Sequence, residues 1–85
     1  MMKNKQTLPE WFDGELYEEG ATVQNRFSGE EAELTATELS MYDFVMGASI
    51  MIEMGMSNPS IIKDLRKGLD WFRKNNSKAY LVLLD

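Results

Sequence analysis

Two stretches of the chain carry apolar residues at helical spacing, and each has recognisable start and stop signals. The first follows Thr35, and Glu38 comes three residues later. This spacing is that of a capping box, in which the Thr side chain and the Glu carboxylate each accept a backbone N–H at a helix start. Gly55 suits the position just after a helix end, where the backbone often turns left-handed. We therefore predict a helix that begins at Ala36 and ends before Gly55.

The second helical stretch begins at Asn58–Pro59, an N-cap residue followed by a proline at the first helical position. We expect it to end near Lys74, because Asn75–Ser77 is a poor helix former. Its apolar side chains share one arc about 100° wide. They are Ile61, Ile62, Leu65, Leu69 and Phe72. For Lys78–Leu84 we predict a short helix, although a buried strand fits this apolar run almost as well.

A β-hairpin is predicted before the first helix. Val23–Asn25 and Glu31–Leu34 have strand-like patterns, and Phe27–Glu30 between them reads as a turn in which Gly29 adopts a positive φ. A lone hairpin is marginally stable, so it must pack on the helices. The expected fold is α+β: a small N-terminal β-hairpin packed on two main helices plus a short C-terminal helix. We expect residues 1–7 to form a disordered tail and residues 8–85 a single domain.

The first helix has two apolar faces. The broad face contains Met41, Phe44, Val45, Ala48, Met51 and Ile52, and a narrower stripe on roughly the opposite side contains Leu39, Met46 and Ile50. A helix at a protein surface needs only one apolar face. The second face therefore packs either on the hairpin or on a second copy of the chain. Trp71 lies off the apolar arc of its own helix, so it meets either the hairpin or a partner. We take Leu39, Met46, Ile50 and Trp71 as the candidate interface.

Composition excludes several kinds of chemistry. The 85 residues include no Cys and no His, which excludes disulfides, thiol nucleophiles, a Ser-His-Asp triad and the usual zinc and haem ligands. No phosphate-binding glycine motif is present either. We therefore expect a non-enzymatic protein without a cofactor or metal, which binds itself as a homodimer or binds another protein.

Charge is divided along the chain, with the acidic residues mainly before residue 57 and a net charge of −5 overall. The basic part either docks on the acidic part within one fold or touches an acidic partner. A basic face on the second helix, beside aromatic residues, suggests an alternative function as a nucleic-acid-associated accessory protein. The overall negative charge opposes that alternative. The face comprises Lys63, Arg66, Lys67, Arg73 and Lys74.

The longest apolar region, Leu39–Met56, is interrupted by Asp43 and Glu53. Each acid near the centre of a membrane span would cost roughly 2.5 to 3.5 kcal/mol, so we expect no membrane span. No secretory signal precedes it, because the basic start is followed by Pro9–Trp11 and not by an apolar run. The cytoplasm is the expected compartment.

Three blocks of sequence together resemble small uncharacterised proteins encoded by marine tailed bacteriophages, especially those that infect cyanobacteria. These blocks are Leu8–Gly14, Phe27–Glu30 through Glu38–Ala48, and Gly68–Lys74 with the Leu83–Asp85 end. The resemblance covers nearly the whole chain. It implies a phage origin and the cytoplasm of an infected bacterium, and it implies no activity and no functional residue. We therefore expect a phage accessory protein that acts on itself or on a host or phage protein.

Overall fold

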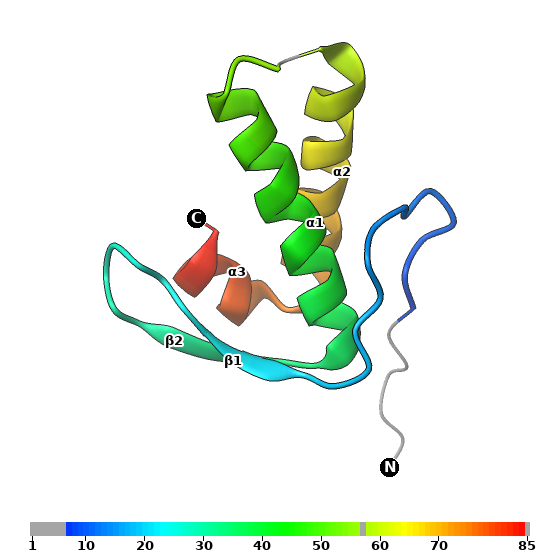
Figure 1. Cartoon of the computed structure of the whole chain (residues 1–85). Helices are drawn as coiled ribbons and strands as arrows, with labels where there is room; N and C mark the ends of the chain where they lie inside the picture. The colour runs from blue at the N-terminus through cyan, green and yellow to red at the C-terminus, as the bar shows by residue number, and fades with distance from the viewer. Residues whose placement is uncertain (1–6, 57, 85) are drawn as a thin grey trace.

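The computed structural model describes residues 7–56 and 58–84. A two-stranded hairpin precedes three helices, and the α1–α2 pair rises away from the hairpin (Figure 1). The predicted α+β fold is confirmed. Its elements are β1 (Ala21–Gln24), β2 (Glu31–Leu34), α1 (Ala36–Glu53), α2 (Pro59–Asn75) and α3 (Ser77–Leu83).

The hairpin is antiparallel, and its register pairs Ala21 with Leu34 and Gln24 with Glu31. The strand β1 ends one residue earlier than predicted, because Asn25 opens the turn. The Asn25 Oδ1 atom accepts the backbone N–H groups of Phe27 at 2.8 Å and Ser28 at 3.2 Å. Asn and Asp favour turns through such local bonds. The predicted positive φ of Gly29 is confirmed at 81°.

The helix boundaries follow the predicted signals. Thr35 and Glu38 form the capping box of α1. At the other end, Gly55 has a φ of 94° and donates its N–H to the carbonyl of Ile52 at 3.0 Å, while Met56 donates to Met51 at 2.9 Å. This pair of bonds is the Schellman motif.

The helix α2 begins at the predicted cap, where Asn58 Oδ1 accepts the N–H of Ile61 at 3.0 Å. The C-terminal segment is a helix, so the strand alternative is wrong. Asn76 explains this outcome, because its side chain caps α3 by accepting the N–H of Ala79 at 3.1 Å. The capped segment packs on β2 and on α2, beside the hairpin (Figure 1). The burial of Ala79 shows that α3 closes one side of the core.

The core forms where α1 crosses α2. Met41, Val45 and Phe72 are buried there, and Leu34 of β2 joins them. Gly68 allows the close approach, because a Cβ atom at this position would lie 2.6 Å from a methyl carbon of Val45. The broad apolar face of α1 is therefore buried at Met41, Val45 and Ala48, whereas Met51 on the same face is 38% exposed.

An N-terminal segment covers part of the α1–α2 pair. The rings of Trp11 and Phe12 lie 5.8 and 5.2 Å from the ring of Phe44, measured between centroids. The indole Nε1 of Trp71 donates to the carbonyl of Thr7 at 3.2 Å. Thr7, the last residue of the predicted tail, is thus held by α2. The rest of that tail and residue 85 lie outside the described residues.

Candidate functional site

The four residues of the predicted interface do not form one surface. Leu39 is partly buried against the core, and Met46 is partly exposed on the side of α1 that faces the hairpin turn. Ile50, one turn further, is 48% exposed. Trp71 lies against the N-terminal segment through its bond to Thr7. The stripe on α1 is thus open only in its second half, and Trp71 is not part of it.

Exposed apolar side chains gather where α1 passes into α2. We call Met51, Met54, Met56 and Ile62 the methionine tip. Met54 is 72% exposed and Met56 is 48% exposed. Ile50 borders the tip, so five of the nine exposed large hydrophobic side chains in the described residues lie between positions 50 and 62. Thioether side chains are flexible and polarisable, which suits adaptable binding surfaces.

A hollow of about 300 Å³ adjoins the methionine tip between α1 and α2. Gly47 leaves space there, because nothing lies within 4 Å of where its Cβ would be. Asp43 and Asp64 stand on the two helices that form its walls. Two acidic side chains beside an apolar lining suit a partner's apolar side chain that has a Lys or Arg next to it. The apolar part of the lining comprises Phe44, Ala48, Met51 and Ile61.

A groove of about 500 Å³ lies on another side of α1, between this helix, the hairpin turn and the end of α3. We call it the turn groove. Phe27 stands at its rim with 90% of its surface exposed. Arg26 lies close enough to Tyr42 to affect it electrostatically: burial raises the pKa of the Tyr42 hydroxyl, and the Arg26 charge opposes that rise. The remaining lining includes Met46, Ser49, Glu53, Leu83 and Leu84.

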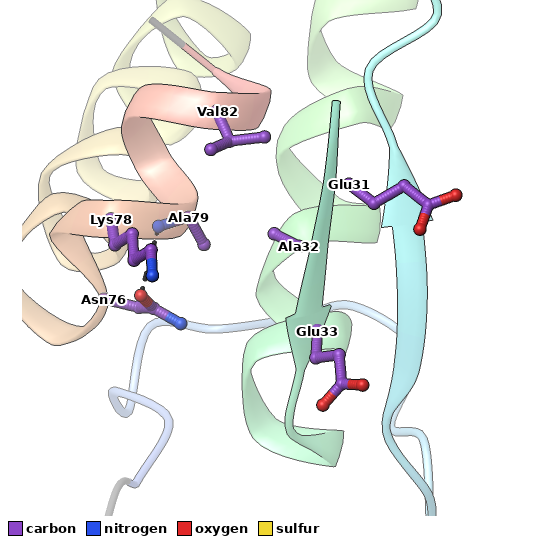
Figure 2. Close-up of a pocket in the computed structure, with 7 residues that line it drawn as sticks. All are labelled: Glu31, Ala32, Glu33, Asn76, Lys78, Ala79 and Val82. Carbon is purple, nitrogen blue, oxygen red and sulfur yellow. Dashed lines mark hydrogen bonds between the residues drawn. The ribbon is translucent and has the colours of Figure 1, made fainter. Parts of the chain in front are cut away.

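A third space, of about 310 Å³, separates β2 from α3. Figure 2 shows that Ala32, Ala79 and Val82 point toward one another across it, while the carboxylates of Glu31 and Glu33 point away from α3. Small side chains therefore leave this space as a gap in packing. Its only base is Lys78, and none of the side chains drawn forms a paired acid and base.

The predicted basic face is largely engaged within the chain. The Lys67 Nζ atom lies 5.2 Å from the ring centroid of Trp11, a cation–π contact. Asp70 pairs with Arg73 at 2.6 Å and with Lys74 at 3.2 Å, and these contacts lower the pKa of the Asp70 carboxyl. The other two bases of the face, Lys63 and Arg66, are exposed. Both of these ion pairs lie inside α2, within the basic part of the chain, so they do not show the predicted docking of the basic part on the acidic part.

Metal-site geometry does not occur among the described residues, since residues 7–56 and 58–84 contain no group of three or more acidic side chains placed to hold an ion. In the same ranges, no helix combines the length and apolarity that a membrane crossing needs. Every buried side-chain nitrogen or oxygen of these residues has a hydrogen-bond partner.

Comparison with known proteins gave no match: no protein-family model, curated protein or solved structure is significantly similar to this chain. Evidence about function therefore comes from the exposed apolar residues and the hollows described above.

Sequence reasoning missed two residues that the structure makes prominent. Phe27 belongs to the predicted turn Phe27–Glu30, and the turn pattern itself says nothing about where its aromatic ring lies. Met54 lies just before Gly55 and belongs to neither of the two apolar faces assigned to the first helix. The signal for both was present, because a large apolar residue within a turn or at a helix end has few neighbours to cover it.

Proposed function

We propose that the protein is a non-enzymatic protein-binding module and that the methionine tip is its main docking surface. The observation that carries this proposal is the gathering of exposed apolar side chains at one end of the α1–α2 pair, beside an open apolar hollow. Contiguous apolar patches on small proteins mark interaction sites.

The side chains at the methionine tip and in the hollow indicate which side chains a partner should present. The flexible side chains of Met54 and Met56 adapt to an apolar surface, while the hollow receives a single apolar side chain. Asp43 and Asp64 at its walls favour a Lys or Arg next to that side chain. The N-terminal segment provides an intramolecular example, since Trp11 and the base Lys67 meet on the same pair of helices.

The resemblance to marine phage proteins supports a setting for this binding. We propose a phage accessory protein that acts in the cytoplasm of an infected bacterium, on a host or phage protein. Binding energy in such interfaces is concentrated in a few desolvated side chains, so changes at the tip are expected to have large effects.

A capture experiment from bacterial lysate tests the proposal. Tagged wild-type protein is compared with the double variant Met54→Ser/Met56→Ser, with nuclease present to remove bridging nucleic acid. The matched control is Leu81→Ser, because Leu81 is 64% exposed on α3, away from the tip. We expect a bacterial protein that is retained by the wild type and the control and lost by the double variant. Equal retention by all three would refute docking at the tip.

A further inference from the structure

We propose that the turn groove receives the second half of α1 from another copy of this chain, so that two copies form a two-fold symmetric dimer. The groove and the methionine tip are different surfaces, and this proposal therefore does not depend on binding at the tip.

The groove has an apolar part and a polar part. Met46, Leu83, Leu84 and Phe27 line the apolar part, and the polar lining includes Asn25, Arg26, Ser49 and Glu53. A phenylalanine that is 90% exposed gains substantially from transfer out of water, and it is held on a rigid turn by the Asn25 side chain. The Asn25 Nδ2 atom also donates to the carbonyl of Val82 at 2.8 Å, which fixes the turn to α3. The groove is thus preformed on both sides.

The second half of α1 has the matching features. The end of α1 rises past the hairpin turn (Figure 1), and the second half of this helix also supplies the α1 wall of the groove. Ser49 and Glu53 lie on the groove side, and Ile50 beside them is 48% exposed. A helix with small and apolar residues on one side can enter a groove of this kind.

The charges at the ends of the groove are self-complementary. Arg26 lies near Tyr42 at one end, and Glu53 ends the helix at the other. Tyr42 and Glu53 are eleven residues apart in sequence, which corresponds to roughly 16 Å along a helix. A two-fold interface brings the same patch together in opposite directions. Antiparallel α1 helices therefore place each Arg26 beside the Glu53 of its partner, and this match identifies a second copy as the occupant.

The same alignment is consistent along the rest of the helix. When Tyr42 of one protomer faces Glu53 of its partner, Met46 faces the small side chain of Ser49. The small Ser49 leaves room for the longer Met46 side chain at the centre of the helix contact. Phe27 of each protomer projects toward the partner's Ile50.

The test is the mass of the protein in solution across a range of concentrations, measured by sedimentation equilibrium at about 0.15 M salt, where the Debye length is near 8 Å. We expect a dimer in the wild type. Phe27→Ser weakens it, and so do the charge reversals Arg26→Glu and Glu53→Arg, each by about tenfold or more in Kd, because like charges then meet at both ends. The double variant Arg26→Glu/Glu53→Arg restores the opposite charges and should recover the dimer.

Glu19→Arg is the matched control, because it makes the same change of charge at an exposed position outside the groove. Circular dichroism confirms that each variant keeps its helices. A wild type that stays monomeric up to about 1 mM would overturn the proposal, since that corresponds to only about 4 kcal/mol of binding free energy. A dimer that is unaffected by Phe27→Ser, or one that the double reversal fails to restore, would also overturn it. The Phe27→Ser protein should still capture a partner from lysate, because Phe27 lies outside the methionine tip. Failure of the dimer proposal can therefore be distinguished from failure of the proposal that a partner docks at the tip.

Discussion

Glu38 is a buried carboxylate that joins three parts of the fold. It is 4% exposed, and its Oε1 atom accepts the backbone N–H of Thr35 and the Nδ2–H of Asn76, both at 3.0 Å. Thr35 starts α1, and Asn76 links α2 to α3. Replacement by alanine removes the acceptor from both donors. We therefore predict that Glu38→Ala loosens the attachment of α3 as well as the start of α1.

The size of the effect follows from these two bonds. A hydrogen bond to a charged group contributes about 1.5–3 kcal/mol, so the loss of both puts the cost near 3 kcal/mol or above. A domain of this length has a total stability of about 4–13 kcal/mol at typical values per residue. The substitution therefore removes a large share of it, and the melting temperature should fall by more than about 10 °C.

Urea denaturation followed by circular dichroism measures the change. Glu38→Gln keeps a carbonyl acceptor, so both donors can still form hydrogen bonds, each now with a neutral partner. Because neutral hydrogen bonds contribute less than bonds to a charged group, we expect this variant to lose about 1 kcal/mol of stability. Glu33→Ala is the control, because Glu33 is exposed on β2 and points away from α3 (Figure 2). A Glu38→Ala variant that unfolds at the same urea concentration as Glu33→Ala would refute the role assigned to this carboxylate.

Three further predictions concern packing and charge on the α1–α2 pair. Gly47→Ala should raise the free energy of unfolding by about 0.5–1 kcal/mol, because the position is helical and open. Gly68→Ala should lower it by about 1–3 kcal/mol, because the new Cβ meets Val45; equal effects of the two changes in urea denaturation would contradict the packing described. Asp70→Asn should be less stable than the wild type at neutral pH, and this difference should vanish as pH falls through the lowered pKa of Asp70, where the carboxyl protonates in the folded state. Thermal melts of the two proteins at about pH 7 and about pH 2 measure this difference in stability. The same difference at both pH values would show that it does not arise from the pairs of Asp70 with Arg73 and Lys74.

Local signals in the sequence predicted most of the elements. The capping box at Thr35, the glycine at position 55 and the Asn58–Pro59 pair each act within a few residues, so each could be recognised without knowledge of the fold. Gly29 belongs to the same class. The end of β1 was misplaced by one residue, because the Asn25 side chain competes with the strand for backbone N–H groups.

Contacts between distant segments were not predictable in the same way. The position of Trp71 depends on Thr7, which is 64 residues away in sequence. A helical wheel showed that Trp71 lies off the apolar arc, but it carries no information about which segment covers that side. The two-sided character of α1 was predicted, and the structure shows that α3 and the hairpin turn flank only part of the second side.

The candidate site was predicted only in part for a related reason. Met46 was identified from periodicity, whereas Phe27 reaches the same groove from a turn that is close only in space. The methionine tip depends on which apolar residues remain uncovered after folding. Exposure is a property of the assembled structure, so periodicity alone could not separate the exposed Met54 from the buried Met41.

Docking at the methionine tip is tested most directly by photocrosslinking in bacterial cells. A benzophenone amino acid replaces Met54 in one variant and Leu81 in another, since their side chains are similarly exposed at 72% and 64%. We predict an adduct with a bacterial protein from position 54 that is absent from position 81 and is reduced by excess unlabelled wild-type protein. The same adducts from both positions, or none from position 54 beyond the chain itself, would contradict the account.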